Sequence, residues 1–352
     1  MDSRRTEHEQ VLFRQDRECG LRAIIAIHDT RLGPAAGGCR LWPYASEVEA
    51  LHDALRLSRG MTYKNALADI PFGGGKSVIL GEADRRPGEV ALERFGGWIE
   101  ELGGRYVTAE DVGMRVADMR VIARRTRYVS GLGRNGIGGD PSPATAEGVL
   151  RGIETAVRIR LGRDSLAGTR VAVQGLGSVG FDLCRRLDQA GATLVVTDIA
   201  TEVVDRAVTA FGAKPVAVTD ILEQDVDVFA PCALGGVLTT ESVRRLRARV
   251  VAGSANNQLA EAPVAALLRD RGVLYAPDYV INAGGVISVA GEYLGAGEDW
   301  VRSRMDAIPG RLQRIFAEAE SSGRTTDEVA EHLALQVIES GTAPDATALT
   351  AV

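Results

Sequence analysis

The stretch RVAVQGLGSVGFDLCRRL, residues 170–187, decides the fold of this chain. It carries the spacing G-x-G-x-x-G at Gly175, Gly177 and Gly180. A buried apolar segment precedes this spacing and an amphipathic pattern follows it, which predicts a strand, a tight turn and a helix. The next predicted strand ends in Asp198, 198 − 175 = 23 positions after the first glycine. Together these features predict a dinucleotide-binding βαβ unit.

Each part of this motif has a physical role in holding a dinucleotide. The first glycine permits the tight turn, the second lets the backbone approach the pyrophosphate, and the third lets helix and strand pack closely. The helix N-terminus offers free N–H groups to the phosphates, so Ser178 and Val179 are assigned to the cofactor site as well. Asp198 is expected to accept hydrogen bonds from the ribose hydroxyls and to repel the extra phosphate of NADP. The predicted cofactor is therefore NAD.

Further strand candidates follow the motif, and helical segments separate them. They are TLVVTD, VDVFAP, RVVAGS and VLYAPD. This alternation predicts parallel βαβ units and a doubly wound α/β sheet of the Rossmann type. Ligands of such sheets bind beyond the carboxyl ends of the strands. The loops APCALGGVL, which contains Ala233, GSANNQL and PDYVINAGG are thus expected to line the cofactor crevice.

The length of 352 residues suggests two domains at roughly 150 residues each. The Rossmann domain is predicted over 139–324, after the hinge-like stretch SGLGRNGIGGDPSP. Residues 1–138 form the predicted N-terminal α/β domain for substrate binding, catalysis and oligomerisation, with a cleft between the domains. A helix at about 325–340 is predicted to return to the first domain, and 341–352 to form a flexible tail.

Within the first domain, QVLFRQD and GLRAIIAIHD predict two strands, and LGPAAGGCR predicts a glycine-rich loop. A helix is expected to begin at Ser46, because Glu49 three positions later completes a capping box. Most of its apolar face is assigned to Val48, Leu51, Leu55 and Leu57. Two more helices and one strand are predicted from PGEVALERFGGWIEEL, VADMRVIARRT and RYVTAEDVG.

Composition excludes several classes of protein. The chain is 45% hydrophobic and 25% charged, as in an ordinary globular protein, and its net charge of −6 disfavours nucleic-acid binding. Its four cysteines are widely spaced and never form C-x-x-C, which suits a reducing cytoplasm and argues against a metal site. No apolar run approaches the ~18 residues of a membrane span. We therefore expect a cytoplasmic protein without membrane, metal or nucleic-acid partners.

The stretch PFGGGKSVIL, residues 71–80, resembles the end of a phosphate-binding P-loop. The leading glycine of that motif would stand at residue 70, which is Ile70. The order of elements is also wrong, because a helix is predicted before this stretch and a strand after it, whereas a P-loop joins a strand to a following helix. Lys76 therefore needs another explanation.

The chain has only three lysines, Lys64, Lys76 and Lys214, among many arginines. The charge of lysine can be lost near neutral pH when the side chain is buried, whereas that of arginine cannot. Lys64 and Lys76 stand beside glycines or small residues, and TAEDVGM offers the carboxylate of Asp111. These three residues are the candidates for proton-transfer chemistry, with two surface lysines as the alternative interpretation.

The chain resembles the amino-acid dehydrogenases of the glutamate, leucine, phenylalanine and valine dehydrogenase superfamily, above all the shorter leucine, valine and phenylalanine members. The matching stretches span residues 9–300 and are GLRAIIAIHDTRLGPAAGGCR, ALRLSRGMTYKNALADIPFGGGKSVI, YVTAEDVG, DPSPATAEGV, VAVQGLGSVG, AGSANNQL and PDYVINAGGVI. The resemblance implies reversible oxidative deamination of an L-amino acid to a 2-oxo acid and ammonia, with hydride passed to NAD⁺. It also implies a homo-oligomer, for which the edge strands at 11–28 are candidates.

The resemblance assigns roles residue by residue. Lys76 matches the catalytic lysine, Asp111 the carboxylate that works with it, and Lys64 the lysine that binds the substrate carboxylate. The remaining matches are Thr145 near the nicotinamide, Asn257 and Asn282 in loops that hold cofactor and substrate, and the backbone of Gly37 and Gly38 at the substrate α-carbon.

Positions that match the side-chain pocket are all apolar: Ala36, Ala109, Val286 and Val289. This argues against glutamate as substrate and favours branched-chain amino acids, with phenylalanine or another aromatic amino acid as the alternative. Outside this family, a metal-dependent decarboxylating dehydrogenase would need more carboxylates than Glu110 and Asp111. An NAD-binding sensor without catalysis is the non-enzymatic alternative.

Overall fold

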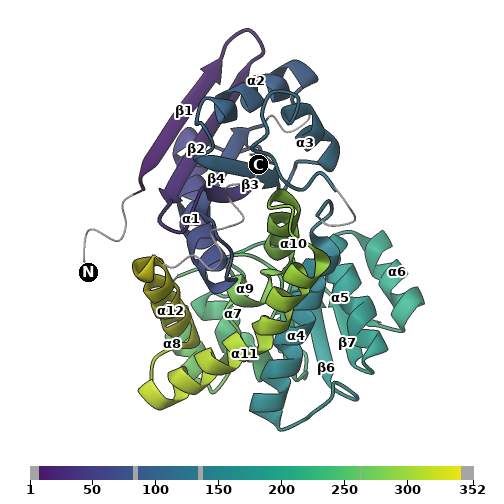
Figure 1. Ribbon diagram of the computed structural model, residues 1–352. Coiled ribbons are helices and arrows are strands. Elements are labelled where there is room, and N and C mark those ends of the chain that lie inside the picture. Colours follow the sequence, from purple (N-terminus) through teal and green to yellow (C-terminus); the bar gives the residue numbers. More distant parts are fainter. Residues whose placement is uncertain (1–7, 82–85, 134–137, 262, 342–352) are drawn as a thin grey trace. The chain divides into compact units, whose positions relative to one another are not determined.

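The computed structural model describes residues 8–81, 86–133, 138–261 and 263–341. The chain folds into two compact units, shown in Figure 1. The first takes in the described residues of Met1–Asp140, Ile287–Val301 and Ala334–Val352, and the second comprises those of Pro141–Val286 and Arg302–Leu333. Part of the predicted hinge and nearly all of the predicted tail lie outside the described residues.

The first unit is built on a five-stranded sheet in the order β1-β2-β4-β3-β5. Its strands are β1 (Gln10–Asp16), β2 (Leu21–Asp29), β3 (Ala35–Trp42), β4 (Gly73–Leu80) and β5 (Tyr106–Glu110). β2 pairs antiparallel with both β1 and β4, while β3 pairs parallel with β4 and β5. The two strands predicted from QVLFRQD and GLRAIIAIHD are confirmed. Lys76 lies inside β4, after a helix, so the rejection of a P-loop is confirmed as well.

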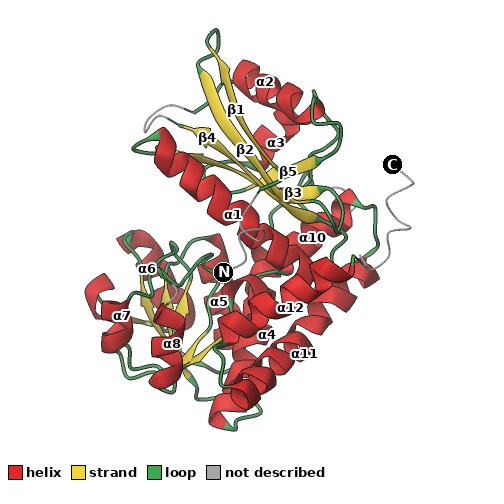
Figure 2. Ribbon diagram, turned by 90° about the vertical axis from the view of Figure 1, so that its left-hand side faces the viewer, coloured by secondary structure: helices red, strands yellow, loops and turns green. Residues whose placement is uncertain are grey.

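Helices cover both faces of this sheet, as Figure 2 shows. They are α1 (Glu47–Leu67) on one face, and α2 (Glu89–Glu100) and α3 (Val116–Ile122) on the other. Because side chains of a strand alternate between faces, Ile24 and Ala26 of β2 pack with α1. Ile25 and Ile27 join the core beneath α2 and α3.

The start of α1 is confirmed, and so are three residues of its predicted apolar face, since Leu51 and Leu55 pack against the core and Leu57 is buried. Ser46 is the N-cap and accepts a hydrogen bond from the Glu49 amide, while the Glu49 carboxylate accepts one from the Ala45 amide. Val48 is 76% exposed, so its assignment to the apolar face is wrong. The small residues Ala50 and Ala54 pack on the sheet instead, which lets helix and strands approach closely.

The prediction of a glycine-rich loop for LGPAAGGCR is wrong for most of this segment. Residues from Ala35 onward form β3, which lies between β4 and β5. Glycine disfavours strands in general, but here there is no room for a side chain. A Cβ on Gly37 would lie 1.8 Å from the Gly75 carbonyl oxygen, and one on Gly38 would lie 2.7 Å from Cβ of Asp111.

The second unit contains a six-stranded sheet in the order β11-β10-β9-β6-β7-β8. All its pairings are parallel. The strands are β6 (Arg170–Gln174), β7 (Thr193–Thr197), β8 (Lys214–Pro215), β9 (Val228–Pro231), β10 (Val250–Val251) and β11 (Leu274–Tyr275). Counted along the chain from β6, this is the 3-2-1-4-5-6 order of a Rossmann sheet, whose direction of winding reverses between β6 and β9. The predicted doubly wound sheet is confirmed, and β8 is an additional short strand.

The remaining helices are α4 (Ser142–Leu161), α5 (Ser178–Gln189), α6 (Thr201–Phe211), α7 (Thr240–Arg245), α8 (Pro263–Asp270), α9 (Asp278–Ile281), α10 (Gly284–Tyr293), α11 (Glu298–Ser322), α12 (Thr326–Ser340) and the 3-10 helix η2 (Val218–Glu223). From Ala334 onward, α12 belongs to the first unit. Among the described residues, no helix has the length and apolar character that a membrane crossing requires.

Candidate active site

The predicted chemical groups of the first unit gather on the sheet face that α1 covers. Strand alternation places Gly74, Lys76 and Val78 of β4 on this face, since Val78 packs with Ala54 of α1. Cys39 belongs to the opposite core, so Arg40 lies on the α1 side. The close approach of Gly38 and the Asp111 side chain places Asp111 there too.

Helix α1 lies close against the strands at this point. A Cβ on Gly74 would lie 2.0 Å from Oγ1 of Thr62, so only glycine permits this approach. Nδ2 of the buried Asn65 donates to the Gly73 carbonyl oxygen at 2.6 Å and so fixes the end of the helix on β4. Lys64 lies in this same last turn and is buried.

Lys76 and Asp111 form a buried ion pair in which Nζ and Oδ2 are 2.6 Å apart. Nε of Arg40 donates to the same carboxylate oxygen at 3.1 Å. Burial alone would raise the pKa of Asp111, but Lys76 and Arg40 outweigh it and hold that pKa well below its usual range. Asp111 is therefore a stable carboxylate between two cations.

Gly37 and Gly38 lie in the middle of β3. They pair with Thr108 and Ala109 of β5. Tyr106 donates from its hydroxyl to the Gly37 carbonyl oxygen at 2.7 Å. The backbone of the two glycines is thus held rigidly beside the ion pair.

The predicted pocket residues lie on different elements. Ala36 is buried in β3, and Ala109 is half-buried in β5 on the Asp111 side. Val286 and Val289 lie on α10, where Val286 belongs to the second unit and Val289 to the first. Strand alternation therefore places Ala36 and Ala109 on the same sheet face as the ion pair, and the two valines lie along one helix.

The glycine motif of the second unit has the geometry of a dinucleotide site. Gly175 has φ +97°, and a Cβ on it would lie 2.7 Å from Ala233. A Cβ on Gly180 would lie 2.0 Å from the Gly175 carbonyl oxygen, whereas one on Gly177 would point into open space. Gly177 and Ser178, at the start of α5, are exposed. The loop therefore leaves room for a ligand at the one glycine whose expected role is close approach.

Three loops meet at the carboxyl ends of the strands of this sheet. Asp198, after β7, accepts hydrogen bonds from the Leu176 amide at 2.6 Å and the Ala200 amide at 2.9 Å. Ala233, after β9, is exposed and contacts Gly175. The contact falls at the switch point between β6 and β9, where doubly wound sheets bind ligands.

The two predicted asparagines belong to neighbouring loops. Asn257 has φ +52°, and its carbonyl oxygen accepts from the Gly236 amide. Asn282 is buried, and Nδ2 donates to the Ser254 carbonyl oxygen at 3.1 Å and to Oδ1 of Asn256 at 3.0 Å. Thr145, in the first turn of α4, donates to the Pro141 carbonyl oxygen.

Sequence reasoning missed three polar residues that shape these sites: Arg40, Asn65 and Gln258. Nε2 of the buried Gln258 donates to the carbonyl oxygens of Gly253 and Ala255, and so shapes the loop after β10. All three stand inside the quoted motifs, but the motifs do not show which groups they bind, least of all for Arg40. Arg40 and Asp111 are 71 positions apart.

Glu110, the second carboxylate of the AEDVG stretch, is half-buried, and burial raises its pKa. Asp140, Asp118 and Asp111 raise it further. Across the part of the chain that the structure describes, no group of three His, Cys, Asp or Glu side chains could hold a metal ion.

Comparison with known proteins covers both units. Residues 8–128 match the family model described as Glu/Leu/Phe/Val dehydrogenase, dimerisation domain, and residues 197–333 match that of the Glutamate/Leucine/Phenylalanine/Valine dehydrogenases. The chain is 52% identical to leucine dehydrogenase of Geobacillus stearothermophilus, covering 95% of this chain and 91% of the relative. It is 48% identical to valine dehydrogenase of Streptomyces virginiae, over 94% and 93% of the two chains.

Solved structures agree with this match. The crystal structure of L-tryptophan dehydrogenase from Nostoc punctiforme has a TM-score of 0.81 and 43% sequence identity, covering 96% of this chain and 98% of that one. The rejection of a P-loop NTPase and the predicted resemblance are thus both confirmed. With its lysine–aspartate pair, its Rossmann sheet and these relatives, the chain belongs to the glutamate/leucine/phenylalanine/valine dehydrogenase family of amino-acid dehydrogenases.

Proposed function

We propose that this protein catalyses the reversible, NAD-dependent oxidative deamination of branched-chain L-amino acids to 2-oxo acids and ammonia. The observation that carries the proposal is the buried pair of Lys76 and Asp111, which lies on the α1 face close against the backbone of Gly38. The leucine and valine dehydrogenases among its relatives support the substrate class.

Oxidative deamination requires a base that can accept a proton near neutral pH. The amine of the substrate must be neutral before hydride leaves its α-carbon, and water must then attack the resulting iminium. We assign both proton transfers to Lys76, whose side chain is buried beside Asp111. Asp111, whose Oδ2 contacts Nζ of Lys76, works with it in these proton transfers. Lys64 binds the substrate carboxylate, and the backbone of Gly37 and Gly38 borders the α-carbon.

The second unit is proposed to hold the cofactor through Gly175, Gly177, Ser178, Val179, Gly180, Asp198, Ala233, Thr145, Asn257 and Asn282. When bound, the nicotinamide supplies the acceptor for the hydride of the substrate. The open space at Gly177 supports this assignment. Asp198 supports NAD over NADP, because a carboxylate repels the additional phosphate. Equal kcat/KM with the two cofactors would contradict that preference.

The apolar residues Ala36, Ala109, Val286 and Val289 are proposed to line the side-chain pocket. The first experiment follows NADH formation with NAD⁺ and each of Leu, Val, Ile, Phe, Tyr, Trp, Met, Ala and Glu at alkaline pH. We expect the branched-chain amino acids to lead. A methylene in an apolar pocket is worth only about 1–3 kcal/mol of discrimination, so several substrates should react. A ranking led by phenylalanine or tryptophan would overturn the branched-chain assignment and keep the mechanism.

The lysine assignment has a matched control in the same chain. Lys76→Met should abolish turnover while NADH still binds, since Lys76 and the glycine motif lie in different units. Lys214→Met, which changes an exposed lysine of the second unit, should keep wild-type turnover. If Lys76→Met retains most of the wild-type kcat, the assignment is wrong.

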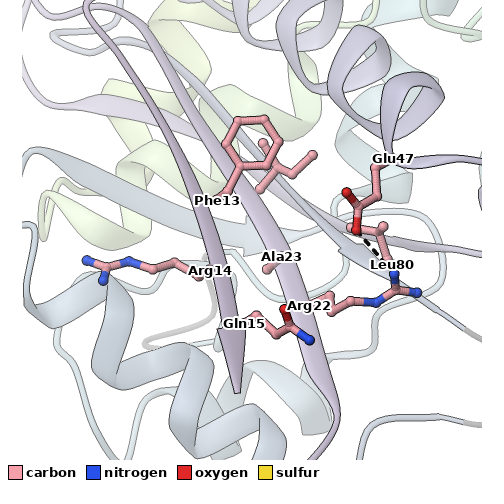
Figure 3. Close-up of a pocket in the computed structure, with 8 residues that line it drawn as sticks. Phe13, Arg14, Gln15, Arg22, Ala23, Glu47 and Leu80 are labelled. Carbon is pink, nitrogen blue, oxygen red and sulfur yellow. Dashed lines mark hydrogen bonds and ion pairs between the residues drawn. The ribbon is translucent and has the colours of Figure 1, made fainter. Parts of the chain in front are cut away.

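We further propose a homo-oligomer that assembles through β1. This strand is at the edge of its sheet, where unpaired backbone groups can accept another strand. Figure 3 shows the pocket beside it, where Phe13 is 59% exposed next to the ion pair of Arg22 and Glu47. The matched family description as a dimerisation domain supports this proposal.

A further inference from the structure

Arg40 links the Lys76–Asp111 pair to a second carboxylate. Its Nε donates to Oδ2 of Asp111 at 3.1 Å, and its Nη1 donates to Oδ2 of Asp53 on α1 at 2.9 Å. The side chain is only 18% exposed, so water screens these contacts weakly. Four charges of alternating sign therefore run from Lys76 through Asp111 and Arg40 to Asp53.

Asp53 is itself held in place. Tyr44 donates its hydroxyl to the same Oδ2 at 2.8 Å, and Nη2 of Arg56 lies 3.5 Å from Oδ1. The guanidinium of Arg40 is planar and remains charged throughout the pH range of the protein. Bonded to carboxylates on two elements, it keeps a fixed positive charge beside Asp111.

Lys76 and Arg40 share one oxygen of Asp111, and this sharing has a chemical consequence. A carboxylate paired with lysine alone favours the protonated lysine and opposes its action as a base. A second cation on the same oxygen weakens the stabilisation of the protonated lysine by the carboxylate, and it also repels the ammonium directly. Arg40 thus favours loss of the proton from Lys76, whereas Asp111 opposes it.

We propose that Arg40 is a positioning residue that divides the charge of Asp111 between two cations and so allows Lys76 to release its proton nearer to neutral pH. The inference rests on the proposed role of Lys76 as the base. Other titratable groups that interact with Asp111 are Glu110, Cys39, Tyr44 and Tyr106, while Asp118 and Asp140 interact with Glu110. Lys64 is buried in the last turn of α1, the helix that covers this sheet face. The same titratable groups are present in every variant, so the comparison of variants isolates the effect of the Arg40 charge.

The test is the pH profile of kcat/KM for deamination of the best substrate, measured from pH 7 to 11. Arg40→Gln should move the rising limb of the profile about one pH unit higher. At pH values below the limb, kcat/KM should then fall roughly tenfold, and at pH values above the limb it should equal that of wild type. Arg40→Lys should restore much of the shift. The substrate amine titrates in the same range but identically in every variant.

Asp53→Asn provides a second variant with the opposite sign. Without the Asp53 carboxylate, Asp111 is the one remaining carboxylate among the described residues that pairs with Arg40. The charge of Arg40 then acts more strongly at Asp111 and Lys76, so the rising limb should move to lower pH. A purely structural role for Arg40 predicts an even loss at all pH values, and an unmoved limb in both variants would overturn the proposal.

The proposed function can fail separately, and the readouts distinguish the two cases. Wild-type protein that deaminates no amino acid in the panel would contradict the proposed function. The charge effect would then be measured by acylation of Lys76 with an amine-reactive reagent across the same pH range, followed by peptide mass spectrometry. Acylation of Lys76 that begins at higher pH in Arg40→Gln supports the proposal, and unchanged acylation contradicts it.

Discussion

At the scale of single residues, glycine marks the places where backbone segments or ligands come closest. The space around a Cβ placed on each glycine distinguishes two kinds of glycine in the cofactor motif. Gly180 is surrounded by protein, whereas Gly177 faces open space at φ −63°, which any residue can adopt. The same six-residue spacing thus contains one position that serves packing and one that we propose serves a ligand.

This difference predicts opposite results for two alanine variants. Gly180→Ala should destabilise the protein, because its Cβ meets the Gly175 carbonyl oxygen at 2.0 Å. Gly177→Ala should keep the wild-type melting temperature and weaken NADH binding, because its methyl group lies where the pyrophosphate is expected. Thermal unfolding and NADH titration by fluorescence measure both. Unchanged NADH affinity in Gly177→Ala would contradict the proposed cofactor position.

At the scale of elements, β1 is one of the two edge strands of the first sheet. The burial pattern alternates from Leu12 to Asp16, and Phe13, which pairs with Ile24 of β2, is on the exposed side of this alternation. An exposed edge with a large apolar side chain is a site where proteins associate unless it is covered. A second copy of β1 is the proposed cover.

The oligomer is tested by changing one side chain on this edge. Phe13→Glu should shift the mass measured by light scattering to a smaller species, because it introduces charge at the proposed contact. Val90→Glu, on α2 of the same unit and 74% exposed, is the control and should leave the mass unchanged. An oligomer that survives Phe13→Glu assembles through another surface.

At the scale of the whole molecule, buried titratable groups make stability depend on pH. His28 is buried on β2, and its Nδ1 lies 2.8 Å from Oγ1 of Thr62 on α1. Burial, helped by the nearby His8, lowers the pKa of His28 to about 4. Asp327 of α12 acts in the opposite sense, since burial together with Asp278 and Glu331 raises its pKa to about 7.

The sign of each effect follows from which state binds more protons. His28 is neutral in the folded state, so its contribution is present above pH 6.5 and is lost as the unfolded state takes up a proton below it. By pH 5 this loss should reach about 2 kcal/mol. The contribution of Asp327 runs the other way, because stability falls as pH rises from about 4 to 7.

Because the two effects oppose each other, variants must be compared with wild type. Urea midpoints at pH 7 and pH 5 should show that His28→Asn loses less stability on acidification than wild type does. His52→Asn, which changes an exposed histidine of α1, should keep the wild-type difference. If His28→Asn and wild type respond equally, His28 is not the source of the acid sensitivity.

The order of strands and helices in the second unit could be read from the sequence, because each element is signalled by neighbouring residues. The glycine spacing, the buried apolar runs and the acid at Asp198 are local patterns, and they predicted the Rossmann sheet correctly. The cap at Ser46 is local in the same way. Lys76 could also be separated from a P-loop, because the order of helix and strand around it is local.

The rest depended on contacts between distant parts of the chain. The strand β3 was predicted as a loop, because glycine has little preference for strands and only the close packing of β4, β5 and α1 explains it there. Val48 was assigned to the apolar face of its helix, because a helical pattern does not show which side chains meet the sheet. Arg40 escaped notice because its partners Asp53 and Asp111 are 13 and 71 positions away. The sequence by itself therefore determined the elements and the family, and the tertiary structure decided which charges meet, since that depends on strand order and close approach rather than on residue spacing.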